Sequence, residues 1–306
     1  MKVLEVDKIR KEYGSLIAVN DLSFSLEEGQ ILGLIGPNGA GKTTLLEMLA
    51  TVLRPSGGTA KILGKDIITD YLSVRRHIGY LPDFFNLYND LKIEECLRFF
   101  AKTYKVPAEQ IDQRIEYALE KINLVDKRHE LMRNLSRGMV QRMGIGVLLV
   151  HEPDVFLLDE PASGLDPRAR IELRDVLRDL SGKGKAIVIS SHILSELSDF
   201  CTHIAIMDKG RMVLWGSVEE IAARAAGVKR IRIGVLSDAA QAVDFIGKYD
   251  GVKIAESQGE IIIAEINGEL EKVAAFNHYL FEKGIKVYEF SEEKKDLEDI
   301  FMAVSK

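Results

Sequence analysis

Residues 31–44 read ILGLIGPNGAGKTT, and this stretch decides how the rest of the chain is interpreted. It begins with the apolar run ILGLI, which fits a strand that is covered on both faces of a parallel sheet. Residues 36–43 then match the pattern G-x-x-x-x-G-K-[ST], and the segment LLEMLATVL after them has a helical pattern. A strand, a glycine-rich turn and a helix in this order predict a phosphate-binding loop.

The residue types in this loop suit a chain of phosphates, which needs many hydrogen-bond donors at short range. Glycines place no Cβ in the way, so backbone N–H groups can converge on the phosphates, and the helix start adds the positive end of its dipole. We expect Lys42 to reach the β- and γ-phosphates and the Thr43 hydroxyl to hold Mg²⁺. The alternative is a turn with a chance lysine, and the flanking strand and helix argue against it.

The composition is that of a globular chain without a basic excess. The chain has 306 residues, which is room for two domains, and 46% of them are hydrophobic. The net charge of −6 predicts no general attraction to nucleic acid or anionic lipid. Cys96 and Cys201 have no metal-ligand spacing and are expected to be ordinary thiols in a reducing compartment.

Hydropathy patterns predict where the chain acts. No apolar stretch approaches the roughly 20 residues that span a bilayer, and the opening MKVLEVDKIR lacks the apolar core of a signal peptide. We therefore expect a cytoplasmic protein, and if it works at a membrane, another polypeptide supplies the membrane part.

Apolar periodicity predicts an α/β chain. Residues 2–35 are expected to be β-rich, residues 56–82 to hold short strands between turns, and residues 91–125 to be helical. Further expected elements are a helix from Ser136, buried strands at 155–158 and 186–191, a helix at 168–180, a hairpin at 204–215 and a helix at 217–226.

Two adjacent carboxylates follow the apolar run at 155–158. Such a pair is costly to bury without a partner, and a Mg²⁺ ion with an attacking water would be that partner. Asp159 would hold the metal directly or through water, and Glu160 would polarise the water. A solvated acidic turn is the alternative, which the upstream phosphate-binding loop disfavours.

Three other positions have a plain structural alternative each. Tyr13 could stack on a purine ring or simply cover the end of a strand. Ser136 and the N–H of Gly138 could bind an anion at a helix start, or Ser136 could be an N-cap and no more. His192 follows the strand at 186–191 and could hydrogen-bond a γ-phosphate, although a lone histidine is more often structural. The residues alone leave these alternatives open.

The pattern of predicted strands and helices changes beyond Gly227. Strands are expected at 230–235, 252–255, 261–266 and 285–290, and helices at 239–248, 270–282 and 296–304. The βαββαβ order of the first six elements predicts a small split-βαβ domain. Residues 228–306 hold 11 Lys/Arg and 15 Asp/Glu, a net charge of −4, which argues against contact with nucleic acid. No catalytic cluster is visible in this part.

Taken together, these motifs resemble the ATP-binding subunits of ABC transporters over about residues 3–225, with every landmark in order. The resemblance implies an α/β P-loop NTPase core with an antiparallel β subdomain and a helical subdomain at about 85–150. The ATP-binding domain would span residues 1–225, followed by the small α+β domain at 228–306.

The family's functional residues carry over to matching positions. The resemblance assigns Asp159 as metal ligand, Glu160 as catalytic glutamate, His192 as switch histidine and Ser163–Asp166 as the D-loop. The residues it assigns to nucleotide binding are Tyr13, Gly36, Pro37, Asn38, Gly39, Ala40, Gly41, Lys42, Thr43 and Thr44, with Ser136 and Gly138 from the signature motif.

The resemblance also implies partners and a reaction. Two ATPase subunits, identical or similar, would pair head to tail and close ATP and Mg²⁺ between the phosphate loop of one and the signature motif of the other. ATP hydrolysis would then drive a separate multi-span membrane permease, with this chain on the inner face of the cell membrane. The transported substrate would depend largely on the permease.

Two departures from the family pattern matter. Asp83 stands where the family usually has glutamine after IGYLP, and a carboxylate can ligate Mg²⁺ but adds charge beside the γ-phosphate. We therefore expect slower or differently coupled turnover. The signature motif reads LSRGM instead of the common LSGGQ, with Ser136 and Gly138 kept. Similar spellings, together with an extra C-terminal domain ending in a motif like that at 297–301, occur among exporter-type ATPases, so we expect an exporter.

Other ATPase classes fit less well. Soluble ABC-type ATPases that act on ribosomes have two cassettes in one chain, and those that act on chromosomes have a long coiled coil between the two nucleotide motifs. This chain has neither, and its acidity also disfavours both. A P-loop kinase or GTPase would lack the signature motif and His192.

Overall fold

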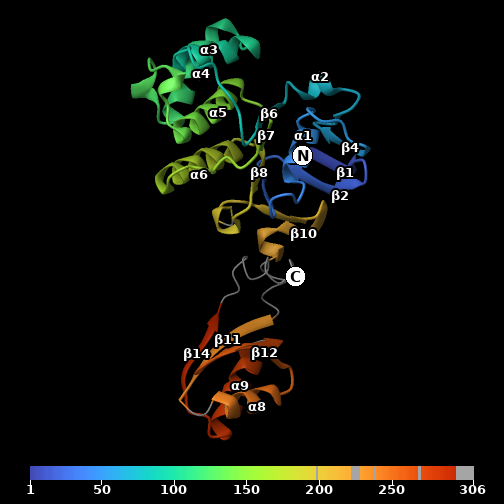
Figure 1. Ribbon diagram of the computed structural model, residues 1–306, viewed down its shortest axis with the longest axis vertical. Coiled ribbons are helices and arrows are strands. Elements are labelled where there is room, and N and C mark those ends of the chain that lie inside the picture. Colours follow the sequence, from blue (N-terminus) through green and yellow to red (C-terminus); the bar gives the residue numbers. More distant parts are fainter. Residues whose placement is uncertain (198, 222–227, 237–238, 268–269, 294–306) are drawn as a thin grey trace. The chain divides into compact units, whose positions relative to one another are not determined.

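The computed structural model describes residues 1–197, 199–221, 228–236, 239–267 and 270–293. The chain divides into two compact units, Met1–Ser217 and Val218–Lys306 (Figure 1). The helix predicted at 296–304 lies outside the described residues. Of the helix predicted at 217–226, residues 218–221 are described and are helical.

A six-stranded sheet forms the centre of the first unit. Its strand order is β10-β9-β3-β8-β7-β6, and all neighbours are parallel except β10, which is antiparallel to β9. Every residue of β3 and β8 is buried, as the continuous apolar runs predict for strands covered on both faces. The strands are β3 (Ile31–Ile35), β6 (Ile78–Leu81), β7 (Val155–Leu158), β8 (Ala186–Ser191), β9 (His203–Asp208) and β10 (Arg211–Ser217).

A second, antiparallel sheet is built from the first part of the chain, as predicted. Its order is β2-β1-β4-β5, and its strands are β1 (Lys2–Tyr13), β2 (Leu16–Glu27), β4 (Gly57–Ile62) and β5 (Lys65–Asp66). Helix α1 (Lys42–Leu49) shares one core with both sheets, because Leu45 and Leu46 belong to the same buried cluster as Leu4 of β1 and Leu34 of β3. The short helix α2 (Tyr71–Val74) was not predicted.

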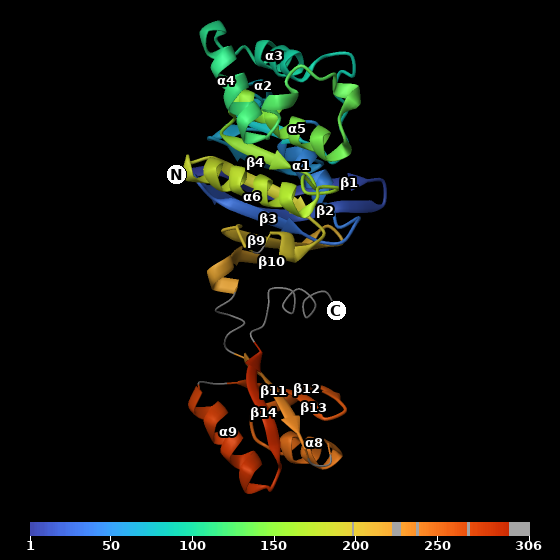
Figure 2. The same ribbon diagram turned by 90° about the vertical axis from the view of Figure 1, so that its left-hand side faces the viewer.

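The helical subdomain contains α3 (Ile93–Thr103), α4 (Ala108–Lys121) and α5 (Arg137–His151), which contact one another (Figures 1 and 2). The helical stretch predicted at 91–125 is two helices, because Lys105 has a φ of 60° and Pro107 caps α4. Helix α6 (Pro167–Gly182) begins at the N-cap Asp166, whose side chain accepts from the N–H of Ala169.

The second unit is one antiparallel sheet with two helices packed on one face, in the predicted βαββαβ order (Figure 2). The sheet order is β12-β13-β11-β14, and its core includes Ile231, Ile262, Phe276 and Leu280. Its elements are β11 (Val228–Val235), α8 (Ala239–Gly247), β12 (Val252–Gln258), β13 (Ile261–Asn267), α9 (Leu270–Glu282) and β14 (Val287–Glu293).

Candidate nucleotide-binding and hydrolysis site

The phosphate-binding loop lies between β3 and α1 and is packed against two other strands. A Cβ on Gly36 would overlap the Met207 carbonyl oxygen, and a Cβ on Gly41 would overlap the Ala18 carbonyl oxygen. Gly41 also has a φ of 101°, which L side chains rarely adopt. Both positions therefore require glycine, and the loop is held in one shape against β9 and β2.

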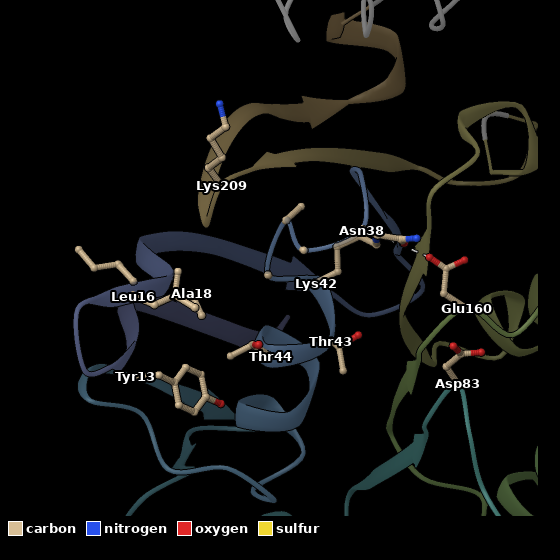
Figure 3. A pocket seen from close by; sticks show the side chains of 14 residues that line it. Tyr13, Leu16, Ala18, Asn38, Lys42, Thr43, Thr44, Asp83, Glu160 and Lys209 are labelled. Carbon is tan, nitrogen blue, oxygen red and sulfur yellow. Dashed lines mark ion pairs between the residues drawn. The ribbon is translucent and has the colours of Figure 1, made fainter.

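Lys42 lies inside the curve of this loop. Its Nζ donates to the carbonyl oxygen of Gly36 at 2.6 Å and to that of Pro37 at 3.3 Å. The same atom lies 3.6 Å from Oε1 of Glu160, and the Lys42 side chain is only 6% exposed (Figure 3). The lysine charge is thus held at the loop by groups that an anion could replace.

A pocket of about 460 Å³ opens beside the loop. Tyr13, which is 49% exposed, lies on one side of it, and Asp83 and Glu160 lie on the other (Figure 3). The lining residues are Tyr13, Leu16, Ile17, Ala18, Asn38, Gly39, Ala40, Gly41, Lys42, Thr43, Thr44, Asp83, Glu160 and Lys209.

Four lining residues were missed from the sequence. Leu16, Ile17 and Ala18 follow Tyr13 across the turn between β1 and β2, and the pairing of Tyr13 with Leu16 brings them to the pocket. The apolar run that follows Tyr13 after the turn at Gly14 and Ser15 is the sequence signal that could have identified them. Lys209 lies in the turn after β9, and it is near the loop because β9 pairs with β3.

The two carboxylates after β7 have different surroundings. Oδ1 of Asp159 accepts from the Ser190 hydroxyl at 2.5 Å, while its Oδ2 is buried and has no hydrogen-bond partner among the described residues. Glu160 lies between Lys42 and His192, whose Nδ1 is 2.9 Å from the Glu160 Oε2. A buried carboxylate oxygen without a donor is the kind of atom that a divalent cation would satisfy, so the donor set fits Mg²⁺.

Asp83 lies beside Glu160 because of the sheet register. Leu81 pairs with Leu158 at the ends of the parallel strands β6 and β7, and each carboxylate follows two residues later. Burial, and then the negative charges of Asp159 and Glu160, raise the pKa of the Asp83 carboxyl. The carboxyl ends of β6 and β7 therefore bring three acidic side chains to one edge of the sheet.

The signature residues do not line this pocket. Ser136 is the N-cap of α5, as predicted, and its hydroxyl accepts from the N–H of Met139 at 3.3 Å. Gly138 faces the turn after β7, since a Cβ there would lie 3.5 Å from Leu165 Cδ2. The start of α5 thus stays outside the pocket that the loop and the carboxylates form.

A glycine loop with an enclosed lysine that contacts Glu160, the glutamate next to the buried Asp159 at the carboxyl end of a parallel strand, defines a P-loop nucleoside triphosphatase. Comparison with known proteins makes the class narrower. The model of the family "ABC transporter" matches residues 19–163. The ABC transporter ATP-binding protein YhcH of Bacillus subtilis is 33% identical over 99% of this chain and 96% of its own length.

Other similar proteins support the same family. The daunorubicin resistance ATP-binding protein DrrA3 of Streptomyces coeruleorubidus is 31% identical over 98% of this chain and 94% of its own length. A solved structure of an ATP-binding subunit of an ABC transporter is 29% identical, with a TM-score of 0.68 over 72% of this chain and 92% of that chain. The chain belongs to the ABC transporter ATP-binding proteins and is an ATPase subunit of a transporter.

Proposed function

We propose that this chain binds MgATP in the pocket beside the loop, hydrolyses it as one half of a head-to-tail pair, and thereby drives export through a membrane permease. The observation that carries the proposal is the 3.6 Å contact between Lys42 of the loop and Glu160, which directly follows Asp159 with its buried Oδ2 that has no partner among the described residues. Within this proposal, residues 1–225 are the ATP-binding domain and residues 228–306 an accessory domain.

Each pocket residue has a role that its position supports. The N–H groups and side chains of residues 36–44, with Lys42, would hold the phosphates, and Tyr13 would stack on the base. The Thr43 hydroxyl and Oδ2 of Asp159 would hold Mg²⁺, with Asp83 as an outer partner of the ion. Bound Mg²⁺ supplies neutralisation of the phosphate oxygens during transfer.

Glu160 is the proposed base for the attacking water. Its carboxylate contacts Lys42 on one side and His192 on the other. Phosphate oxygens in the loop would attract the Lys42 ammonium more strongly than the loop carbonyls do, because their charge is greater. Glu160 would then keep only its contact with His192, which orients it and leaves one oxygen to accept a proton from water.

The proposal of a head-to-tail pair follows from the position of the signature residues outside the pocket. Ser136 and Gly138 begin a 15-residue helix with anion-binding geometry, yet they do not line the pocket of their own chain. A second copy, or a similar ATPase, placed head to tail would bring this helix start to the γ-phosphate. Hydrolysis would therefore depend on the pair.

Export through a permease is supported by the relatives and by the surface. Proteins named Nod factor export ATP-binding protein I match 72% of this chain at 35% identity, and DrrA3 is named for daunorubicin resistance. None of the helices in the described ranges has the length and apolar character to cross a bilayer. Phe84 is 81% exposed, the exposed Tyr88 follows it closely in the chain, and the ring of Tyr88 lies 5.0 Å from that of the exposed Phe99. We propose that this aromatic surface docks the permease at the inner face of the membrane.

Purification of the full chain from detergent-solubilised membranes tests the partner. A multi-span membrane protein should co-purify with the wild type, and the Phe84→Ser variant should recover less of it. Phe281→Ser is a matched control, since Phe281 is similarly exposed at 78% but belongs to the second unit. Recovery of ribosomes or DNA in place of a membrane protein would support the soluble ATPase class and contradict the permease.

A further inference from the structure

One arginine of helix α6 holds the two segments that lead to the contact between Glu160 and His192. Arg170 is the fourth residue of α6, which packs beside strand β8 (Figure 1). Its Nε donates to the carbonyl oxygen of Leu165 at 3.2 Å, and its Nη1 lies 2.7 Å from Oε1 of Glu196. The first contact is on the turn after Glu160, and the second is on the segment after His192.

The first contact of Arg170 restrains the turn that begins at Glu160. The N–H of Ser163 donates to the Glu160 carbonyl oxygen at 3.0 Å, and the N–H of Leu165 donates to the Ala162 carbonyl oxygen at 3.2 Å. The Leu165 side chain is buried. Because these bonds and this burial make the turn stiff, holding the Leu165 carbonyl oxygen restrains the backbone that carries Glu160.

The second contact restrains the segment that carries His192. Oε2 of Glu196 accepts from the Ser191 hydroxyl at 2.9 Å, and the same hydroxyl oxygen accepts from the N–H of Ile193 at 3.0 Å. Ser191 is the last residue of β8 and is only 2% exposed. The backbone on both sides of His192 is thus held by one buried hydroxyl, whose direction is set by Glu196.

These contacts form a closed circuit outside the pocket. The turn links Glu160 to Arg170, the ion pair links Arg170 to Glu196, and Ser191 links Glu196 to His192. The circuit closes where Nδ1 of His192 lies 2.9 Å from Oε2 of Glu160. Neither Arg170 nor Glu196 lines the pocket beside the loop. The Glu196 side chain is only 13% exposed, so its charge depends on its partner Arg170.

We propose that Arg170 and Glu196 are positioning residues that act as one unit to set the contact between His192 and Glu160. A guanidinium suits this task, because its planar fork of donors holds two oxygens in fixed directions. The inference rests on the proposed function, in which Glu160 is the base and His192 orients it. Loss of either positioning residue should leave nucleotide binding intact but loosen the contact that orients the base.

A double-mutant cycle in the full chain tests the unit through the rate of MgATP hydrolysis. Arg170→Gln should lower kcat about tenfold and change KM less than about twofold, because Arg170 does not line the pocket. Glu196→Gln should lower kcat by a similar factor, and the double variant should lose no more than either single variant. Arg170→Lys should restore kcat to within about threefold of the wild type, since it keeps the ion pair but lacks the fork.

Arg178 provides a matched control on the same helix. Its Nη2 donates to the Asp199 carbonyl oxygen at 2.6 Å, so it also ties α6 to the segment after His192, at a point beyond Glu196. Arg170→Gln and Arg178→Gln should lower the midpoint of thermal unfolding by similar amounts, less than about 3 °C each. Only Arg170→Gln should lower kcat, and equal losses of kcat in both variants would overturn the proposal.

The ring nitrogen resonances of His192 give a second measurement that needs no hydrolysis. The chain has six histidines, so a ¹⁵N-histidine-labelled sample gives few signals, and the His192→Gln variant identifies those of His192. Without nucleotide, Arg170→Gln and Glu196→Gln should both shift the His192 signals, while Arg178→Gln should leave them in place. Unchanged His192 signals in the first two variants would overturn the inference at any rate of hydrolysis.

The outcomes separate this inference from the proposed function. If the wild type hydrolyses MgATP but Arg170→Gln leaves kcat unchanged, or the double variant loses the product of the two single losses, the positioning unit is wrong and the proposed function stands. If the wild type neither binds nor hydrolyses MgATP, the proposed function is wrong, and the His192 signals then decide alone whether Arg170 and Glu196 set the position of His192.

Discussion

The two ends of the parallel sheet in the first unit differ in how their charges are arranged. At the amino ends, His77 precedes β6, Asp154 precedes β7 and Lys185 precedes β8. His77 lies 2.9 Å from Nζ of Lys65 and 2.7 Å from Oδ2 of Asp154, and Lys185 lies 3.6 Å from the other oxygen of Asp154. The His77 ring thus bridges a lysine and an aspartate, Lys185 also pairs with that aspartate, and each of these groups has a partner within the protein.

At the carboxyl ends, three negative charges meet, and although Glu160 contacts Lys42 and His192, the charges are not balanced as at the amino ends. Asp83, Asp159 and Glu160 follow β6 and β7, and one oxygen of Asp159 is without a donor among the described residues. A folded chain tolerates such an arrangement where a bound ligand compensates the negative charge. The loss of stability is then a property of the functional site. The difference teaches that the balanced polar contacts at one end serve stability, while the crowded negative charges at the other end serve binding. Substitutions at the two ends should therefore have separable effects.

The largest expected effect is at Glu160. Glu160→Gln should lower kcat for MgATP hydrolysis by at least about 100-fold, because it removes the base while keeping the shape of the side chain. ATP binding should persist, and a stable ATP-bound pair should appear by size-exclusion chromatography with light scattering. Asp154→Asn, at the opposite end, should leave kcat unchanged. A fully active Glu160→Gln enzyme would remove Glu160 from the role of base.

The second-largest expected effect is a loss of nucleotide affinity when the lysine of the loop is removed. Lys42→Ala should weaken MgATP binding by about 100-fold in a calorimetric titration, since it removes a charged group that reaches the phosphates. Lys65→Ala removes a lysine at the amino ends, and it should leave MgATP affinity unchanged while lowering the free energy of unfolding by about 1 kcal/mol. Equal losses of affinity in both variants would contradict the division between the two ends.

The third prediction concerns the pH dependence of stability near the paired end. Both ring nitrogens of His151 are buried without a partner among the described groups, and burial, then the charges of Arg114 and Lys185, lowers its pKa from 6.5 to about 4. The unfolded chain then binds more protons between these two values, so stability should be full above pH 7 and fall as the pH decreases. We expect a loss of up to about 2 kcal/mol at pH 5.

Urea unfolding at pH 7.5 and pH 5 measures this loss. His151→Phe should show a smaller difference between the two pH values, because the phenyl ring keeps the contact with Tyr104 but cannot be protonated. His278→Phe is a suitable control, since His278 is an exposed residue of the second unit paired with Glu282. An unchanged pH dependence in His151→Phe would exclude His151 as its source.

The smallest expected effect is at Asp83. Asp83→Gln should raise the rate of MgATP hydrolysis by about two- to fivefold and alter its Mg²⁺ dependence, because it removes one negative charge beside the γ-phosphate. Steady-state rates over a series of Mg²⁺ concentrations measure both changes. A variant with unchanged rate and unchanged Mg²⁺ dependence would show that the carboxylate has no part in turnover.

The sequence predicted the parts of the site that depend on local patterns. The loop at 36–43 and the carboxylates Asp159 and Glu160 each follow an apolar strand directly, so strand pattern and chemistry are adjacent in the chain. What it could not predict depends on long-range pairing. Asp83 reaches Glu160 through the pairing of β6 with β7, and Lys209 reaches the pocket through the pairing of β9 with β3.

Prediction of the fold from local sequence patterns was limited in the same way. The βαββαβ order of the second unit was predicted because each element has its own period, and the structure confirms it. The helical pattern at 91–125 did not show that this stretch is two helices, since apolar periodicity continues across the break at Lys105, whose φ is 60°. Backbone strain of this kind has no signature in the hydrophobic pattern.

Trp215 on β10 is the only tryptophan of the chain, and its ring stacks on His203 at 5.4 Å and lies 5.8 Å from Phe24. Its fluorescence therefore reports on the first unit, while the second unit contributes none. Indole emission and far-ultraviolet circular dichroism, followed together during denaturation, can distinguish whether the two units melt in one transition or two without any added label.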